Sequence, residues 1–394
     1  NDVPVGKKQE LDIERLAHDG RGIAFFQGRT WFVSGAMPNE RVIARVLSAR
    51  NKVVDAQTLN VLKPTAERIT PFCSLAGQCG GCTLQHMPIA QQRRFKQEAV
   101  LNQLQRVGVE VAEVAPLVHG EEQGYRCRTR LAVKVDEKGQ VKLGFRALAS
   151  QAIVSVEQCP ILVEPLRAVL PSLTPLLHSL ARADAIGHLE LFQGNATVLL
   201  VRLNRALSAE DEQKIREYCT TQAIQLWWQT KAEPYPDAQE QALFYELPEF
   251  GLQVDYRPGD FVQVNPAVNR QMVQQALNWL ELRADEYVLD LYCGLGNFSL
   301  PLAQAVQSVT AVEGVETMVQ RAQQTALRQG IENIEFMCAD LSQAQSSAAW
   351  AKQVYSAVVL DPPRDGADEV VKQLATMPIE RILYVSCNPA TLAR

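Results

Sequence analysis

Short runs of hydrophobic, mostly β-branched residues alternate with longer amphipathic stretches from residue 286 onward. Five such runs can be counted, at residues 287–291, 308–312, 334–337, 357–360 and 381–385. Runs of this length separated by helical stretches are typical of strands in a parallel sheet that is covered on both faces. The pattern therefore predicts a doubly wound α/β sheet in which the last run, 381–385, is a buried strand like the others.

The amino-terminal residues follow a different pattern. Short strand-like runs between residues 8 and 65 are separated by turn-forming residues at 18–22, 27–28 and 38–40. This spacing predicts a small β-barrel of the oligonucleotide-binding type, with an ordinary solvated β-domain as the alternative. We expect three domains: the barrel at 1–65, a central α+β domain at 66–255 and the α/β domain at 256–394, with a helix over 89–107.

Charge is distributed unevenly along the chain. Residues 1–150 contain 22 lysines and arginines against 15 acidic residues, a net charge of +7, whereas residues 151–394 contain 17 against 29, a net charge of −12. The positive part is where a polyanion would bind. Arg126, Arg128 and Arg130 alternate, so in a strand they would project from one face and could follow a phosphate backbone. Trp227 and Trp228 could stack on bases or pack in a core.

The turn after the first α/β strand carries Gly294 and Gly296, which favour positive φ and close approach to a ligand. Glu313 ends the second strand 19 residues beyond Gly294, where an acid can accept hydrogen bonds from ribose hydroxyls. The third glycine of pyrophosphate-binding turns is absent. Acids after the next strands, Asp340 and Asp361, suit S-adenosylmethionine, so the pattern favours methyl transfer over hydride transfer.

Nine cysteines in a chain with a polar amino terminus and no run of 18 apolar residues indicate a cytoplasmic protein without a membrane partner. Cys73, Cys79 and Cys82 form a Cys-x5-Cys-Gly-Gly-Cys cluster, and Cys159 is a candidate fourth ligand. Four thiolates suit iron–sulfur or zinc, and this spacing favours [4Fe-4S]. A redox-active thiol group is the alternative. Four others are expected to be buried hydrophobic residues: Cys127, Cys219, Cys293 and Cys338.

The ninth cysteine, Cys387, follows the last predicted strand within Ser-Cys-Asn-Pro. The carboxyl ends of strands in open α/β sheets are where ligands bind. Cys387 would therefore face a bound cofactor.

These features together resemble the RNA 5-methyluridine methyltransferases over nearly the whole chain. The resemblance rests on the basic barrel, the cysteine cluster, the glycine turn at 290–297, Asp-Pro-Pro-Arg at 361–364 and Ser-Cys-Asn-Pro at 386–389. The arrangement is most similar to the branch that carries a TRAM domain and modifies 23S ribosomal RNA. By resemblance, Cys387 is the nucleophile, the [4Fe-4S] ligands are Cys73, Cys79, Cys82 and Cys159, and the S-adenosylmethionine contacts are Gln263, Tyr292, Asn297, Glu313, Asp340 and Asp361.

The resemblance implies covalent catalysis, in which the Cys387 thiolate adds to C6 of uracil so that C5 can accept a methyl group. The family's general base is a glutamate beyond Ser-Cys-Asn-Pro, and no residue of this chain, which ends at Arg394, can be assigned to it. We therefore expect a carboxyl-terminal truncation that turns over poorly and leaves the last strand at an unprotected edge.

Several alternatives stay open on the sequence. The substrate could be transfer RNA or two ribosomal sites instead of one. An amine methyltransferase would leave Cys387 without a role, and a non-catalytic RNA-binding protein or an iron–sulfur oxidoreductase are further possibilities. A single basic face and a single active site suggest a monomer.

Overall fold

The computed structural model describes residues 3–394. The chain forms two compact units, each with most of its contacts within itself. Unit 1 contains Asn1–Leu117, Arg130–Pro160 and Leu170–Asp184. Unit 2 contains Val118–Thr129, Ile161–Val169 and Ala185–Arg394. The predicted domain boundaries at 65 and 255 stay a prediction.

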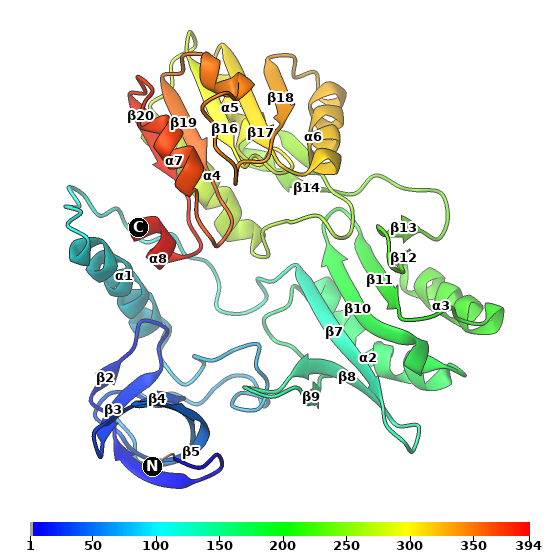
Figure 1. Cartoon of the computed structure of the whole chain (residues 1–394). Helices are drawn as coiled ribbons and strands as arrows, with labels where there is room; N and C mark the ends of the chain where they lie inside the picture. The colour runs from blue at the N-terminus through cyan, green and yellow to red at the C-terminus, as the bar shows by residue number, and fades with distance from the viewer. Residues whose placement is uncertain (1–2) are drawn as a thin grey trace. The chain divides into compact units, whose positions relative to one another are not determined.

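Unit 1 begins with a six-stranded sheet that curls into the ring visible at the amino-terminal end of Figure 1. The strand order is β1-β5-β6-β4-β3-β2. Its strands are β1 (Lys8–Asp12), β2 (Arg15–Leu16), β3 (Gly22–Phe26), β4 (Arg29–Ser34), β5 (Arg41–Arg50) and β6 (Val53–Lys63). The predicted breaks at 27–28 and 38–40 fall between these strands, and so does the break at 18–22 except for Gly22, which begins β3.

Alternation of side chains explains how this sheet makes a core. Val42, Ala44 and Val46 are buried on β5 while the residues between them are partly or fully exposed. Successive side chains of a strand point to opposite faces, so every second residue enters the interior. Trp31 on β4 packs in the same core and is 2% exposed.

The rest of unit 1 includes a long helix and an antiparallel meander. Helix α1 (Ile89–Arg106) lies where the sequence predicts a helix. Strand β7 (Arg128–Val135) pairs with β8 (Val141–Arg146), which pairs with β9 (Ile153–Ser155). Helix α2 (Glu164–Ser179) and a 3-10 turn at Ala183–Ala185 follow in the chain, and unit 1 contains their residues from Leu170 to Asp184.

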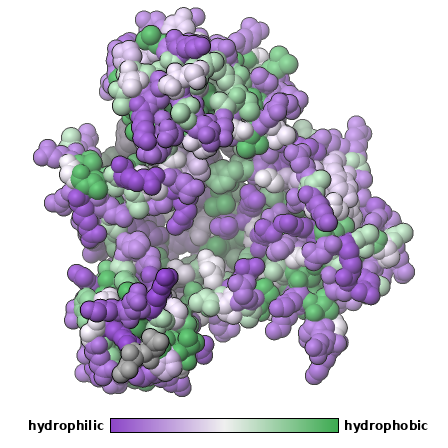
Figure 2. All heavy atoms as spheres, in the orientation of Figure 1, coloured by the Kyte–Doolittle hydropathy of each residue, from purple (hydrophilic) through white to green (hydrophobic). Residues whose placement is uncertain are grey.

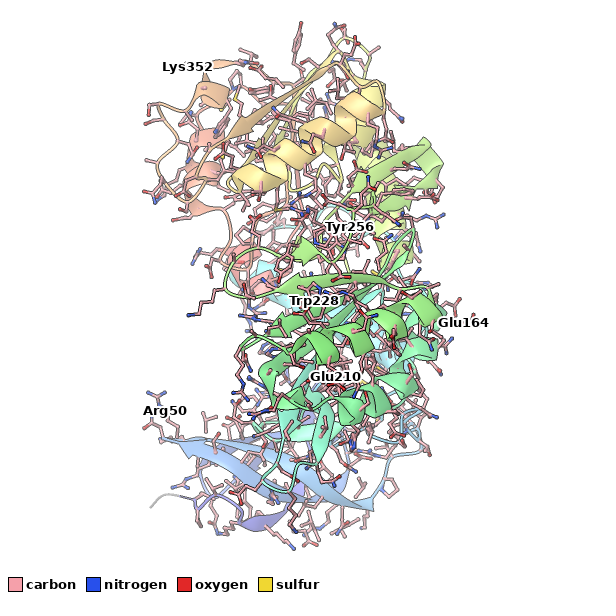
Figure 3. The ribbon with its side chains drawn as sticks, turned by 90° about the vertical axis from the view of Figure 1, so that its right-hand side faces the viewer. Arg50, Glu164, Glu210, Trp228, Tyr256 and Lys352 are labelled. Carbon is pink, nitrogen blue, oxygen red and sulfur yellow. The ribbon has the colours of Figure 1, made fainter. Side chains whose placement is uncertain are left out.

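Unit 2 contains a mixed group of strands and a hairpin before its α/β part. The strands are β10 (Ile186–Gln193), β11 (Thr197–Leu203), β12 (Gln225–Gln229) and β13 (Tyr235–Pro236), with helix α3 (Ala209–Gln222) between β11 and β12. Trp227 and Trp228 of β12 are 1% and 4% exposed, and Trp228 lies among the strands and helices of this region (Figure 3). These tryptophans pack in the core, so the base-stacking alternative is wrong.

The α/β part of unit 2 is the predicted parallel sheet. Its order is β18-β17-β16-β19-β20, and every neighbouring pair is parallel. The strands are β16 (Tyr287–Leu291), β17 (Ser308–Glu313), β18 (Ile334–Cys338), β19 (Ala357–Leu360) and β20 (Arg381–Tyr384). Helices α4 (Pro266–Leu280), α5 (Ser299–Ala305), α6 (Glu316–Arg328), α7 (Asp368–Leu374) and α8 (Pro389–Ala393) accompany them (Figure 1). The hairpin β14 (Phe244–Leu247) and β15 (Leu252–Asp255) precedes α4, and 3-10 turns lie at Pro248–Phe250 and Ala349–Lys352.

Both faces of the central strands are covered. Val288 of β16 belongs to the core that α4 and α5 form, whereas Leu289 belongs to the core that α7 and the turn at Ala349–Lys352 form. Strand order reverses direction between β16 and β19, which is the point where ligands bind in doubly wound sheets.

The sequence predicts the last strand both as a buried strand and as an unprotected edge. The edge is confirmed, and the burial is wrong. Among the described residues β20 is the edge of the sheet, and Ile382 is 52% exposed. An edge strand has a neighbour on one side only, so its outward residues meet solvent. Cys127, Cys219 and Cys293 are buried as predicted, but Cys338 is exposed at the end of β18, which corrects the expectation for that residue.

No helix within residues 3–394 is both long and apolar enough to span a membrane. The surface seen in Figure 2 is mostly hydrophilic, with hydrophobic residues scattered among the polar ones. Single exposed hydrophobic residues are normal on water-exposed surfaces.

Candidate active site

The turn after β16 brings backbone amides to the carboxyl edge of the sheet. Tyr292, Gly294 and Gly296 all have positive φ, at 59°, 55° and 97°. A Cβ atom on Gly296 would lie 3.2 Å from Cγ of Leu300, which is fully buried. The turn thus requires glycine at 296 for both its backbone conformation and its packing.

Glu313 at the end of β17 is fixed against this turn. Its Oε1 accepts a hydrogen bond from Gly294 N at 3.1 Å, and its Oε2 accepts one from Val315 N at 2.9 Å. Each carboxylate oxygen has a further lone pair available. Glu313 is therefore held in one orientation and can still accept hydrogen bonds from two neighbouring hydroxyl groups.

Asp340 and Asp361 follow β18 and β19 at the same edge but differ in environment. Hydrogen bonds from the hydroxyl and the backbone amide of Ser342 hold the pKa of the exposed Asp340 below its usual value. Burial raises the pKa of Asp361 to about 6. Asp340 is thus a permanent carboxylate, whereas Asp361 is a carboxylate whose charge a cation would stabilise.

Asp290 is a buried acid at this edge to which the sequence assigned no role. It is 1% exposed, and burial raises its pKa to about 7, with the nearby charges of Asp361 and Glu313 adding to the rise. Ser299 donates a 2.5 Å hydrogen bond to its Oδ2, while its Oδ1 has no hydrogen-bond partner among residues 3–394. Asp290 is the first residue of the glycine-turn motif at 290–297, and this position is the sequence signal that could have identified it.

Tyr292 lies among the other predicted cofactor residues. Burial raises its pKa to about 12, and the rise includes contributions from Tyr384, Asp340 and Glu313. The phenol therefore stays protonated at neutral pH. Tyr292 and Tyr384 also pack against the same core cluster, which contains Leu291.

Asn297 closes the glycine turn and is tied to two residues that the sequence did not single out. Its Oδ1 accepts hydrogen bonds from Tyr245 Oη at 2.9 Å and Asn269 Nδ2 at 3.0 Å. Its Nδ2 donates to Asn269 Oδ1 at 2.8 Å. Asn269 belongs to the buried stripe of α4, together with Val273, and a polar residue in such a stripe is the signal that could have found it.

Gln263 lies in the loop that leads into α4. Arg321 of α6 makes a bidentate ion pair with Asp260 of this loop, at 2.6 and 3.0 Å. Cys127 donates its backbone N–H to Val264 O at 2.9 Å. Gln263 is half-buried and lines a small cavity of about 30 Å³ together with Asn269. The loop is thus fixed on both sides of Gln263.

Cys387 follows β20, with its side chain exposed. Asn388 and Thr391 both donate to the backbone oxygen of Arg364, at 3.2 and 3.0 Å. The Ser386 hydroxyl accepts a hydrogen bond from Asn388 N at 3.0 Å. Cys387 therefore sits in a loop joined to the Asp-Pro-Pro-Arg loop after β19, and its thiol is open to a ligand.

The predicted metal cysteines all lie in unit 1. Gly80 N donates to Arg146 O at 2.9 Å, and Gly81 N donates to Cys79 Sγ at 3.3 Å. Cys79 and Cys82 line one cavity of about 240 Å³. No disulfide links the nine cysteines, and within residues 3–394 no three His, Cys, Asp or Glu residues form a group that could hold a metal ion.

The arginines predicted to follow a phosphate backbone are not equivalent. Arg126 and Arg128 are half-buried, and Arg130 is exposed. The Arg128 guanidinium lies 5.1 Å from the centre of the Phe192 ring, and its Nη1 donates to Asp260 O at 3.3 Å. Arg128 therefore has structural contacts within unit 2.

The sheet, its glycine turn and the acids at its carboxyl edge define a Rossmann-like methyltransferase domain. The family model described as tRNA (Uracil-5-)-methyltransferase matches residues 90–394, and the TRAM domain model matches residues 2–59. The chain belongs to the tRNA (uracil-5-)-methyltransferase family and carries a TRAM domain.

Relatives of high identity have one described activity. The protein from Pseudomonas fluorescens described as 23S rRNA (uracil(1939)-C(5))-methyltransferase RlmD is 52% identical over 394 residues, covering 100% of this chain and 88% of its own length. The RlmD protein of Pseudomonas aeruginosa is 51% identical over 395 residues, again covering 100% and 88%. The crystal structure of Pyrococcus abyssi tRNA (uracil-54, C5)-methyltransferase in complex with S-adenosyl-L-homocysteine has a TM-score of 0.73 and 22% identity, covering 98% of this chain and 91% of its own. The last likeness concerns the fold.

Proposed function

We propose that this protein transfers a methyl group from S-adenosylmethionine to C5 of one uridine in 23S ribosomal RNA. The observation that carries the proposal is Cys387, an exposed thiol beside the Asp-Pro-Pro-Arg loop at the carboxyl edge of a methyltransferase sheet. Amine methylation would give this cysteine no task. The activity described for the RlmD relatives supports the uracil-C5 reaction.

Cys387 acts as the nucleophile in this proposal. Its Sγ forms a bond to C6 of uracil, and the electron pair of the C5–C6 double bond moves into the ring as an enolate that makes C5 nucleophilic. S-adenosylmethionine would supply the methyl group that bonds to C5, and it would leave as S-adenosylhomocysteine with the electron pair of the broken bond between sulfur and the methyl carbon. When a base removes the proton from C5, an enolate forms again. The C5–C6 double bond is then restored as the bond between C6 and Sγ breaks, which releases the Cys387 thiolate.

The proposed cofactor contacts are Gln263, Tyr292, Asn297, Glu313, Asp340 and Asp361. Their chemistry fits the ligand, because S-adenosylmethionine carries a ribose diol, an ammonium group and a sulfonium. Glu313 offers two oriented carboxylate oxygens to the ribose. Asp340 and the half-buried Asp361 offer negative charge, and Asp361 gains from a cationic partner because burial raises its pKa to about 6.

The TRAM domain is the proposed contact for RNA. Phe25 of β3 is 51% exposed, and the Arg15 guanidinium lies 5.8 Å from the centre of its ring. An exposed aromatic ring beside a cation is suited to an unpaired base and its phosphate. Residues 2–59 contain 9 lysines and arginines against 7 acidic residues, and the net charge of +7 over residues 1–150 supports RNA contacts in this part of the chain as a whole. A ribosomal RNA substrate fits a cytoplasmic location.

We further propose that Cys73, Cys79, Cys82 and Cys159 bind a [4Fe-4S] cluster. The cluster takes each thiolate on a different iron atom, so four cysteines need not converge on one ion. The hydrogen bond from Gly81 N to Cys79 Sγ suits a sulfur that carries negative charge. A Cβ on Gly80 would lie 2.9 Å from Arg146 O, so the glycine lets this loop lie close to its neighbour. Such a cluster would order the loop without taking part in methyl transfer.

The test uses the full chain, S-adenosylmethionine and a 23S ribosomal RNA fragment that contains 5-fluorouridine. Fluorine cannot leave C5 as a proton does, so a covalent protein–RNA adduct is expected in the mass spectrum, and Cys387→Ala should abolish it. Cys338→Ala is the matched control, because Cys338 is also an exposed cysteine at the end of a strand of this sheet. An adduct that survives in Cys387→Ala, or none in the wild type despite bound cofactor, would refute the mechanism.

A further inference from the structure

Most of the hydrogen-bonding groups of the Asn297 amide are already occupied by bonds to other side chains. Both lone pairs of its Oδ1 are occupied, one by Tyr245 Oη at 2.9 Å and one by Asn269 Nδ2 at 3.0 Å. One N–H of its Nδ2 is donated to Asn269 Oδ1 at 2.8 Å. Among the residues that the structure describes, one N–H donor of the Asn297 amide is left and no acceptor.

Asn269 is itself held in place by the start of its helix. Asn265 caps α4, with its Oδ1 accepting from Val268 N at 3.1 Å, and Pro266 occupies the first turn. The backbone N–H of Asn269 donates a helical hydrogen bond to Asn265 O at 3.0 Å, and Asn269 is 5% exposed. Its side chain is thus fixed by the same segment that carries Gln263.

Tyr245 provides the second support from a different element. It lies on β14, where it pairs with Val254 of β15. Burial raises the pKa of Tyr245, so its hydroxyl remains a donor throughout the physiological range. Together β14, α4 and the glycine turn meet at the oxygen of Asn297.

We infer that Tyr245 and Asn269 are positioning residues, which orient the Asn297 amide so that it offers one N–H donor to an acceptor oxygen of S-adenosylmethionine. The inference rests on the proposed function, since it takes Asn297 as a cofactor contact. Without Tyr245 or Asn269 the amide of Asn297 can rotate. Either its Nδ2 donor or its Oδ1 acceptor can then face the cofactor. Neither residue needs to contact the cofactor itself.

A matched pair of tyrosines allows a sharp test. Tyr256, labelled in Figure 3, is 5% exposed and lines the same small cavity as Tyr245, but its hydroxyl has no hydrogen-bond partner among the described residues. Tyr245→Phe and Tyr256→Phe remove the same atom from two rings that line one cavity, of which Tyr245 is half-buried and Tyr256 is buried. Only the first change releases Asn297.

Titration calorimetry of the full chain with S-adenosylmethionine is the measurement. We expect Tyr245→Phe to weaken binding about two- to tenfold, as for the loss of one hydrogen bond, and Tyr256→Phe to bind like the wild type. Asn269→Asp, which keeps the volume but loses the donor, should weaken binding at least as much. In turnover assays the KM for S-adenosylmethionine should rise in Tyr245→Phe, with kcat at saturation unchanged.

The outcomes separate this inference from the function on which it rests. If the wild type and Asn297→Ala bind S-adenosylmethionine differently but Tyr245→Phe and Asn269→Asp match the wild type, the positioning role is wrong and the function stands. If the wild type does not bind S-adenosylmethionine, both the proposed function and the positioning role of Tyr245 and Asn269 are wrong. Equal losses in both tyrosine variants would also overturn the positioning role, because cavity packing would then explain them.

Discussion

Single residues at the carboxyl edge of the sheet differ in charge because their surroundings differ. Asp340 is exposed and receives two hydrogen bonds from Ser342, so its pKa falls below the usual value. Asp290 is buried, and one of its oxygens has no hydrogen-bond partner in residues 3–394, so its pKa rises to about 7. Two aspartates of one sheet thus differ in ionisation near neutral pH: Asp340 is a carboxylate, whereas Asp290 is partly protonated.

The buried Asp290 should make stability depend on pH. Its folded pKa of about 7 lies above the ordinary value of 3.8, so between these values the folded state binds more protons than the unfolded state. Its contribution to the free energy of unfolding therefore falls as pH rises from about 4 to 7, by at most about 1.4 kcal/mol per pH unit. Asn cannot ionise, so the melting temperature of Asp290→Asn relative to the wild type should increase between pH 5 and pH 7.5.

Asp285→Asn is the control for this comparison, because the Asp285 side chain is 87% exposed and its replacement should give no such trend. A difference in melting temperature between Asp290→Asn and the wild type that stays constant with pH would show that Asp290 is already ionised in the folded state at pH 5.

At the scale of elements, the turn between β16 and α5 joins fold and site. Its amide at Gly294 orients Glu313, and its last residue, Asn297, is held by β14 and α4. Gly294 and Gly296 adopt positive φ without strain, whereas Tyr292, at 59°, is a non-glycine residue whose left-handed backbone the surrounding contacts must maintain. Changes in this element should therefore affect cofactor binding as well as folding.

Gly296→Ala tests this dual role, with Gly330→Ala as the matched control. Both glycines have positive φ, 97° and 72°, so both changes incur the left-handed backbone cost of about 1–2 kcal/mol. A Cβ at Gly330 meets nothing within 4 Å, whereas one at Gly296 lies 3.2 Å from Leu300. We expect Gly296→Ala to be the less stable variant in thermal unfolding, and the only one of the two with weakened S-adenosylmethionine binding.

Equal cofactor affinity in Gly296→Ala and Gly330→Ala would contradict this expectation. The turn at Gly296 would then have a purely structural role, and the proposed placement of the cofactor against it would need revision.

At the scale of the whole molecule, the proposed functions are divided between the two units. The basic TRAM domain and the four candidate cluster cysteines belong to unit 1, and the candidate catalytic and cofactor residues belong to unit 2. Loss of the cluster should consequently affect RNA binding and leave cofactor binding intact. The monomeric state expected from the sequence stays a prediction.

Cys159→Ala tests this division, with Cys338→Ala as the control. After anaerobic reconstitution with iron and sulfide, we expect Cys159→Ala to retain less iron and less sulfide than the wild type and to bind the RNA fragment more weakly. Its affinity for S-adenosylmethionine should match that of the wild type. Full iron content in Cys159→Ala, or stoichiometric zinc in the protein as isolated, would contradict the cluster assignment.

Much of the fold could be predicted because it depends on local patterns. The five parallel strands of the α/β part, the barrel turns and helix α1 all fall where hydrophobic period and turn residues put them. The sequence predicts the final strand as an unprotected edge, and this is confirmed, but the expectation that its residues are buried was wrong, because an apolar run does not reveal what covers it. Cys338 was misjudged for a similar reason: burial depends on what packs over the end of β18.

The candidate site divides in the same way between sequence and tertiary structure. The sequence by itself determined the glycine turn, the acids that end successive strands and the cysteine after β20, because parallel strands bring their carboxyl ends to one edge. Only the tertiary structure decided that Tyr245 and Asn269 meet at Asn297 and that Asp290 is buried with one oxygen that has no hydrogen-bond partner within residues 3–394. These contacts join residues 28 and 52 positions apart, and no local pattern fixes which distant side chains come within hydrogen-bond distance.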